Sequence, residues 1–124
     1  MSTPNAAHAW RVMDHIDANT ELHEQDTWLH KTKCGTAGCY AGWTCLLAGD
    51  KPLWGGPDAD LTFMVEASGE ARPVRVDRRA QELLGLDDDA ADDLFNPHNS
   101  RSELRQLVAE IFGERPELEA EPQS

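Results

Sequence analysis

The chain has 124 residues, the size of one ordinary domain, which excludes two separate well-packed cores. A domain of this length buries enough surface to fold without a disulfide or a metal ion. Its net charge of -12 repels phosphate groups and argues against direct binding to nucleic acid or to an anionic membrane.

The first predicted helix begins at Thr3 and Pro4, because Thr is a good N-cap and Pro suits the first helical position. Apolar residues then recur at helical spacing and form one stripe, made of Ala6, Ala9, Trp10, Met13 and Ile16. We expect the helix to end at Asn19, since Asn tolerates the left-handed conformation that often closes a helix.

The next part of the chain predicts a polar loop followed by a second helix. Residues 21–33 are mostly polar, and we expect Trp28 and Leu29 to hold this loop to the core. The second helix is expected to begin at Thr36 and to run to residue 48, with Gly49 as its stop signal.

The middle of the chain predicts irregular structure and then a hairpin. Residues 50–60 contain two Pro and two Gly, which mark turns and loops. Residues 61–66 and 72–76 are predicted to pair as a β-hairpin around a loop of four or five residues. Pro73 has no N–H for a strand ladder, so the second strand is expected at a sheet edge.

Two helices are predicted after the hairpin. Asp77 is expected to cap a helix over residues 78–84, and Gly85 is expected to close it. Residues 88–95 predict a short helix, because acidic side chains crowd its first turns, where the helix dipole favours negative charge.

The last predicted helix follows a capping box formed by Ser100 and Glu103. Its apolar stripe is the clearest in the chain and consists of Leu104, Leu107, Val108, Ile111 and Phe112. Residues 114–124 predict a disordered acidic tail. The expected fold is therefore mainly α with α+β character: a compact helical domain over residues 1–113, built around a small-residue helix, with one small β-hairpin.

The most unusual segment, residues 34–43, reads Cys-Gly-Thr-Ala-Gly-Cys-Tyr-Ala-Gly-Trp. Glycine in a helix interior costs roughly 1 kcal/mol relative to alanine, so two glycines four residues apart need a reason. A helix face that carries Gly38 and Gly42 lets another backbone approach closely. We therefore expect this helix to be buried at the centre of the domain.

The same segment also permits a metal site or a redox pair. His30, Cys34 and Cys39 are candidate zinc ligands, with His23 or Cys45 as the fourth. Cys34 and Cys39 are alternatively a redox couple, although their Cys-x4-Cys spacing differs from the Cys-x2-Cys of known oxidoreductases. The predicted helix places Cys39 at its third position, where the dipole stabilises a thiolate.

Motifs of the common enzyme classes are missing from the sequence. It has no Walker loop, no dinucleotide fingerprint and no Gly-x-Ser-x-Gly elbow. His8 and His15 lie seven residues apart on the first predicted helix, where an ordinary partly exposed face explains them. A nucleophile pair of Cys39 and His30 remains an open alternative. The sequence therefore favours a binding protein over an enzyme.

The chain resembles a group of small uncharacterised bacterial and phage proteins that share a series of short motifs. Those motifs are a Trp before Cys-Gly-Thr, then Cys-x-Ala-Gly, a Glu-Leu-Leu-Gly-Leu helix, an acidic turn, Leu-Phe and a final amphipathic helix. Here they correspond to Trp28 and residues 34–36, 39–42, 82–86, 87–93, 94–95 and 104–112. The resemblance implies a recurring domain of phage or mobile-element type, and it implies no activity or catalytic residue.

The acidic half of the chain suggests how a protein partner would be engaged. Residues 50–124 carry eighteen acidic and eight basic residues, whereas residues 1–49 carry five and three. We expect a binding or regulatory protein whose acidic surface steers a partner; the proposed contacts are Asp88, Asp89, Asp92 and Asp93. Trp54 is the candidate anchor in this surface, with packing back onto the core as its alternative.

The remaining expectations concern location and cofactors. No secretory signal is seen, and the longest weakly apolar stretch, residues 37–49, is too short to span a bilayer. An odd number of cysteines suits reduced thiols, so we expect a cytoplasmic protein without membrane association. No cofactor is expected, with zinc as the alternative, and the sequence does not specify an oligomeric state.

Overall fold

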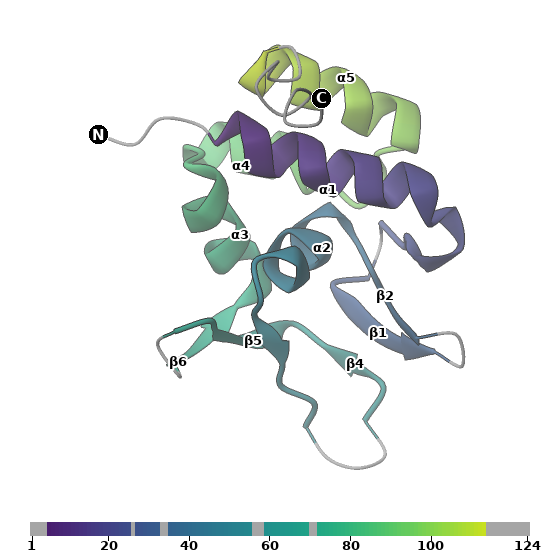
Figure 1. Ribbon diagram of the computed structural model, residues 1–124, viewed down its shortest axis with the longest axis vertical. Coiled ribbons are helices and arrows are strands. Elements are labelled where there is room, and N and C mark those ends of the chain that lie inside the picture. Colours follow the sequence, from purple (N-terminus) through teal and green to yellow (C-terminus); the bar gives the residue numbers. More distant parts are fainter. Residues whose placement is uncertain (1–4, 26, 33–34, 56–58, 70–71, 114–124) are drawn as a thin grey trace, which may run out of the picture.

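The computed structural model (Figure 1) describes most of the chain, namely residues 5–25, 27–32, 35–55, 59–69 and 72–113. Within these ranges the chain forms five α-helices and two three-stranded antiparallel sheets. The predicted α+β character is therefore confirmed, whereas the prediction of a single small hairpin is wrong. The tail predicted at residues 114–124 lies outside the described ranges.

Helix α1 (Ala6–Ala18) begins after Asn5, whose side chain accepts a hydrogen bond from the backbone N–H of His8 at 3.2 Å. The prediction that Thr3 caps this helix is wrong, and Thr3 itself lies outside the described ranges. The expected end at Asn19 is confirmed, although Asn19 has a φ of -134° and does not adopt the left-handed conformation. The buried face confirms most of the predicted apolar stripe and consists of Ala9, Trp10, Val12, Met13 and Ile16.

Helix α5 (Arg101–Phe112) lies beside α1 and covers it (Figure 1). The predicted capping box is confirmed: Ser100 N–H donates to the Glu103 carboxylate at 2.8 Å, and Glu103 N–H donates to Ser100 Oγ at 3.1 Å. The indole N–H of Trp10 donates to the carbonyl of Gly113 at 3.0 Å, which ties the end of α5 to α1.

Helix α2 (Tyr40–Leu47) occupies the centre, between the helices and the sheets (Figure 1). The prediction that it begins at Thr36 is wrong, because residues 35–38 form a strand and Cys39 is the N-cap. Gly35 has a φ of 125°, a backbone conformation that residues with a side chain rarely adopt. Glycine is also unfavourable in the interior of a helix, so this segment has little preference for a helix. Residues 35–38 instead pair with residues 29–32, and this pairing makes them a strand.

The first sheet has the order β2-β1-β4 and consists of β1 (Leu29–Thr32), β2 (Gly35–Gly38) and β4 (Leu61–Thr62). The prediction of a loop over residues 21–33 is wrong for residues 29–32, which form β1. A short 3-10 helix, η1 (Thr20–Leu22), also falls in this region. Strand β1 pairs with β2 next to it in the chain and with β4 about thirty residues later.

The second sheet has the order β3-β5-β6 and consists of β3 (Lys51–Pro52), β5 (Met64–Ala67) and β6 (Arg72–Arg75). The predicted hairpin is confirmed as β5 and β6, and Pro73 lies on the edge strand as expected. Its first strand is shorter than predicted, because residues 61–62 belong to the other sheet.

Helices α3 (Val76–Leu84) and α4 (Asp88–Leu94) follow the second sheet. Gly85 adopts the left-handed conformation at φ 69° and closes α3, as predicted. The prediction that Asp77 caps α3 is wrong, since the helix begins at Val76, two residues earlier than predicted, and Asp77 lies in its first turn. Asp87 is the N-cap of α4.

The two glycines of the unusual segment pack against the backbone of Trp28. A Cβ added at Gly38 would lie 2.6 Å from the Trp28 carbonyl oxygen, and one added at Gly42 would lie closer still. The predicted close approach of a second backbone is therefore confirmed, and both glycines are buried. Only Gly42 belongs to the helix; Gly38 belongs to β2.

The core joins all five α-helices to the first and second sheets. Its largest fully buried side chains include Tyr40, Met13, Ile16, Leu29, Leu84, Leu94 and Leu104. None of the helices in the described ranges has the length and apolar character needed to traverse a lipid bilayer.

Candidate functional site

Cys39 is the N-cap of α2 and is buried, with 1 % of its surface exposed. The N–H of Gly42 donates to its sulfur at 3.5 Å. Burial nevertheless raises the pKa of the Cys39 thiol to about 11, because removal of water outweighs the backbone N–H groups near the sulfur. The prediction that Cys39 occupies the third helical position is wrong, and its thiol is protonated at neutral pH.

The other candidate zinc ligands are placed only in part. His30 lies half-buried on β1, with its Nδ1 2.9 Å from a carboxylate oxygen of Glu24. Cys34 lies outside the described ranges. His23 Nε2 lies 2.9 Å from the side-chain oxygen of Gln25. Within the described ranges, no three His, Cys, Asp or Glu side chains gather closely enough to hold a metal ion. A zinc site that includes Cys34 stays a prediction.

Cys45 and His8, which lies on α1, are held by hydrogen bonds. Cys45 is buried, its thiol donates to the carbonyl of Val76 at 3.5 Å, and burial raises its pKa strongly. His8 Nε2 donates to the carbonyl of Thr44 at 2.9 Å, since a carbonyl can only accept. Arg11 donates to His8 Nδ1 at 3.3 Å, so the ring is neutral in this arrangement. Burial lowers the pKa of His8.

Helix α4 displays the four predicted partner-binding acids, and all four are exposed. Asp88 accepts a hydrogen bond from the side-chain amide of Gln81 at 2.9 Å. The side chains of Asp89, Asp92 and Asp93 make no hydrogen bond or ion pair in the described part of the chain. Their negative charges therefore face solvent without compensation.

A groove runs beside α4 and is lined by aromatic residues. It consists of two adjoining pockets, of about 350 and 130 Å³, that share Trp28, Phe95 and Pro97. Asp92 lines the larger pocket together with Asp77. We call this surface the aromatic groove. It places an uncompensated carboxylate next to aromatic rings, a combination that suits a cationic side chain.

Gln25 holds the two walls of the aromatic groove together. Its amide N–H group donates to the carbonyl of Asn96 at 2.9 Å, just after α4. Its side-chain oxygen accepts from the backbone N–H of Tyr40 at 3.1 Å, at the start of α2. The loop that precedes Trp28 is thereby tied to both helices, so the groove has a defined shape.

Trp54, the predicted anchor, lies elsewhere. It is half-buried and packs partly against the core, and Lys31 Nζ lies 4.8 Å from the centre of its ring. The pocket that Asp92 lines is lined by Trp28 and not by Trp54, and the pocket that Asp93 lines includes neither tryptophan. Next to Trp54, Leu53 is exposed, as are Leu61 and Phe63 in the neighbouring chain segment.

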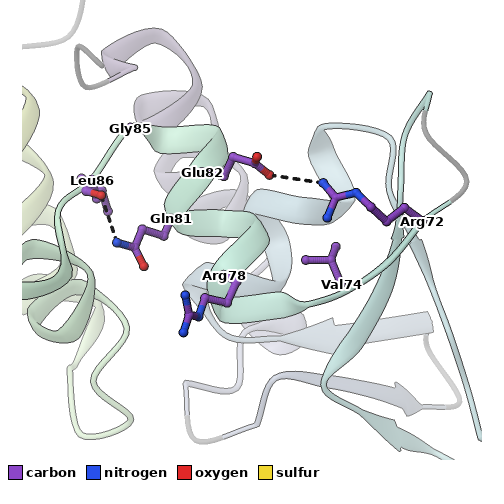
Figure 2. Close-up of a pocket in the computed structure, with 7 residues that line it drawn as sticks. All are labelled: Arg72, Val74, Arg78, Gln81, Glu82, Gly85 and Leu86. Atoms are coloured by element: carbon purple, nitrogen blue, oxygen red, sulfur yellow. Dashed lines mark hydrogen bonds and ion pairs between the residues drawn. The ribbon is translucent and has the colours of Figure 1, made fainter. Parts of the chain in front are cut away.

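The sequence reasoning missed a basic pocket that also borders α3 and shares Gln81 with the aromatic groove. Four of the eight arginines fall within residues 72–79. Arg72 and Arg78 line a pocket of about 460 Å³ with Val74, Glu82 and three further residues (Figure 2). The signal was visible as Arg-Pro-Val-Arg-Val-Asp-Arg-Arg, a basic run in an acidic chain, but net charge alone hides such a local excess.

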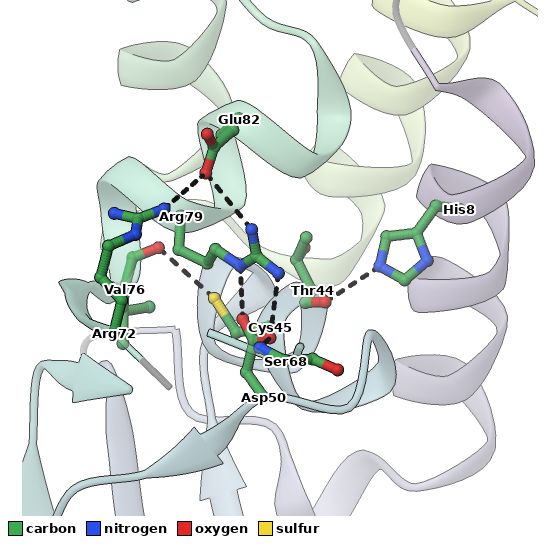
Figure 3. Close-up of polar contacts among 9 residues, drawn as sticks. All are labelled: His8, Thr44, Cys45, Asp50, Ser68, Arg72, Val76, Arg79 and Glu82. Carbon is green, nitrogen blue, oxygen red and sulfur yellow. Dashed lines mark hydrogen bonds and ion pairs between the residues drawn. The ribbon is translucent and has the colours of Figure 1, made fainter. Parts of the chain in front are cut away.

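A buried ion pair stands behind this pocket. Arg79 Nε donates to Asp50 at 2.8 Å, and Asp50 also accepts from the backbone N–H of Ser68 at 2.7 Å (Figure 3). Arg79 Nη1 lies 3.3 Å from Glu82 at the protein surface. Hydrogen bonding to Asp50 raises the pKa of Arg79 further. The pair ties the end of α2 to α3 and to the β5–β6 turn.

Comparison with protein-family models, with curated proteins and with solved structures finds no match to this chain.

Proposed function

We propose that this protein is a binding or regulatory protein that acts through a protein partner, and that the partner presents basic side chains to α4 and the aromatic groove. The observation that carries the proposal is the meeting of Trp28, Phe95 and the uncompensated carboxylate of Asp92 in one concave surface. Opposite charge accelerates encounter and selects against wrong partners. A few buried anchors then supply most of the affinity.

The positions of the acids support a role beyond helix capping. Asp88 and Asp89 lie in the first turn of α4, where the helix dipole stabilises negative charge. Asp92 and Asp93 lie in the last turn, where the same dipole opposes negative charge. Helix stability therefore explains the first two acids and leaves the last two for another purpose.

The aromatic groove gives the basic partner an anchor. An arginine side chain can stack on the ring of Trp28 while its guanidinium pairs with Asp92, and both interactions strengthen as water is excluded. Asp77 contributes less, because Arg75 already holds its carboxylate through two hydrogen bonds of 2.9 and 3.1 Å. The partner's chemistry is therefore an arginine-bearing segment with apolar neighbours.

The setting that we propose is a bacterial or phage protein acting in the cytoplasm. It rests on the resemblance to small bacterial and phage proteins and on Cys39 and Cys45, which are buried as thiols. For a phage-type protein, the partner would belong to the host. The alternative of a thiol or zinc function centred on Cys34 and Cys39 gains no support from the raised pKa of Cys39.

The test combines affinity capture from a bacterial extract with two matched variants. Asp92→Asn with Asp93→Asn removes two charges beside the aromatic groove. Glu21→Gln with Asp60→Asn removes two exposed charges elsewhere. A specific partner should bind the first variant about tenfold more weakly or worse, and the second about as well as the wild type.

Salt dependence provides the second readout. Binding of the captured partner should weaken as ionic strength rises, and this dependence should flatten in the Asp92→Asn, Asp93→Asn variant. A partner that binds both variants equally and shows no salt dependence would contradict the proposal. A partner that loses binding only when Cys34 or Cys39 is changed would move the function to the thiol segment.

A further inference from the structure

The two pockets of the aromatic groove differ in their chemistry. Among the described residues, only uncharged ones line the smaller pocket, which has a volume of about 130 Å³. The larger pocket, of about 350 Å³, is also lined by Asp77 and Asp92. Both pockets share Trp28, Phe95 and Pro97. A ligand that crosses these three residues therefore meets an uncharged pocket on one side and an acidic pocket on the other.

The size of the smaller pocket limits what it can hold. Pockets for drug-sized ligands measure roughly 300–1,000 Å³, whereas a cavity of about 150 Å³ holds one benzene molecule. At about 130 Å³, the smaller pocket suits a single side chain with the size of a five-membered ring. Proline has such a ring, and segments rich in proline dock into grooves lined by aromatic residues.

Trp28 also has an unused hydrogen-bond donor. The indole N–H groups of Trp10 and Trp43 each donate to a backbone carbonyl at 3.0 Å. The indole N–H of Trp28 has no acceptor among the described residues. Within the same ranges, His15 Nε2 is the one buried side-chain nitrogen or oxygen without a partner, so the Trp28 indole N–H is in contact with solvent. A ligand in the groove lies beside this residue and can supply the missing carbonyl.

An unpaired indole N–H favours a ligand whose backbone carbonyls are free. An α-helix uses its carbonyls for its own hydrogen bonds, whereas a polyproline II helix has no internal hydrogen bonds. Its three residues per turn and rise of about 3.1 Å place residues three apart on one face, about 9 Å from each other. Such a segment is already extended before it binds, so it loses little conformational entropy in the groove.

The acidic pocket selects the second side chain of this segment. Asp92 has no hydrogen-bond or ion-pair partner among the described residues, whereas Arg75 already holds Asp77. An arginine guanidinium can pair with a carboxylate and stack on an aromatic ring at the same time. An arginine three residues from the proline therefore completes the match between the segment and the two pockets.

We infer that the aromatic groove binds an extended segment of the partner that contains proline and arginine three residues apart. The proline enters the smaller pocket, and the arginine pairs with Asp92 in the larger one. This inference rests on the proposed function, which requires a basic partner, and it adds the backbone conformation and the second anchor of that partner. A partner that presents its charges from an α-helix would satisfy the proposed function alone.

The experiment titrates the full chain with two acetylated and amidated peptides, Ala-Pro-Pro-Ala-Pro-Arg-Ala and Ala-Arg-Pro-Ala-Pro-Pro-Ala. The two peptides place proline and arginine three residues apart in opposite directions. Calorimetry measures the affinity, and NMR spectra follow the backbone amide and indole signals. We expect saturable binding of at least one peptide. The largest shifts should fall at Trp28 and at residues 92–97, and the indole signal of Trp28 should shift more than those of the other tryptophans.

Matched peptides and variants separate the two anchors. Replacing every proline of the peptide by alanine keeps its charge, and replacing its arginine by glutamine keeps its prolines; each change should weaken binding about fivefold or more. Asp92→Asn should weaken binding of the parent peptide to a similar extent. Asp89→Asn is the control, because Asp89 lies on the same helix but lines neither pocket, and it should change the affinity less than twofold.

Two results would overturn the inference. One is an alanine peptide that binds as tightly as its proline parent, because charge alone would then explain binding. The other is the absence of saturable binding for both proline peptides. In either case, a captured partner that depends on Asp92 and Asp93 would leave the proposed function standing, whereas a partner that ignores both charges contradicts the proposed function itself.

Discussion

The protein treats the charges that are buried behind α3 and the charges that are exposed on α4 in opposite ways. Asp50 is fully buried, and each of its carboxylate oxygens has a donor from Arg79. Asp92 and Asp93 are exposed and have no partner in the described part of the chain. The buried pair of Asp50 and Arg79 holds the end of α2 against α3. Asp92 and Asp93 leave their negative charges exposed to solvent.

This difference separates residues that the fold requires from residues that it tolerates. A buried charge without its partner loses its hydration and gains nothing in return, so the fold depends on the complete pair. An exposed acid in the last turn of a helix is opposed by the helix dipole, so it contributes nothing to the stability of the fold. Substitutions in the two regions should therefore have very different consequences for stability and for binding.

The largest expected effect is the loss of the buried pair. Asp50→Ala should lower the free energy of unfolding by about 3–5 kcal/mol, because Arg79 is left buried without its carboxylate. The double variant Asp50→Ala, Arg79→Met should lose less than Asp50→Ala alone, since no unpaired charge then remains. Urea unfolding measures both. An Asp50→Ala protein as stable as the wild type would contradict the comparison.

A second large effect is expected where the Trp28 carbonyl meets α2. Gly42→Ala should lower the free energy of unfolding by about 1–3 kcal/mol, because the added methyl group overlaps this carbonyl. Gly55→Ala is the control: nothing lies within 4 Å of its added Cβ. Thermal unfolding compares the two. Equal melting temperatures would mean that the backbone near Trp28 yields easily.

A smaller effect should divide α4 itself. Replacing Asp88 and Asp89 by Asn removes charges that the helix dipole favours, and stability should fall by about 0.3–1 kcal/mol. Replacing Asp92 and Asp93 by Asn should leave stability unchanged or raise it slightly. If the second pair also loses stability, these acids have a structural role and the case for a binding role weakens.

The smallest effect concerns a histidine on α1. Burial lowers the pKa of His8, so the unfolded chain takes up a proton that the folded protein resists. Stability should therefore fall as pH drops below about 6.5, the ordinary value for histidine, and His8→Gln should show a flatter dependence. Melting temperatures between pH 8 and pH 5.5 test this; parallel curves would contradict it.

Local signals predicted the parts of the fold that local chemistry decides. The capping box of Ser100 and Glu103, the left-handed Gly85 and the edge position of Pro73 all depend on residues close together in the chain. The strand at residues 35–38 could not be predicted in this way. It depends on pairing with β1 and on the approach of Trp28, and both are contacts between separate segments.

The candidate site was predicted to a smaller extent. The sequence singled out the acids of α4, and these are exposed, but it paired them with Trp54 rather than with Trp28. Which aromatic residue lies beside an acidic helix depends on how the first sheet packs, and no local pattern reports that. The pocket lined by Arg72 and Arg78 escaped notice because these two arginines come from different elements, β6 and α3.

Trp28 belongs both to the packed interior around α2 and to the aromatic groove. Its carbonyl is confined by Gly38 and Gly42, while the same residue lines the aromatic groove. A backbone confined in this way has little room to shift, so a ligand meets a preorganised wall and loses less conformational entropy on binding. Binding should in turn suppress local opening next to Trp28. Amide hydrogens of β1 should then exchange with solvent more slowly in the complex than in the free protein.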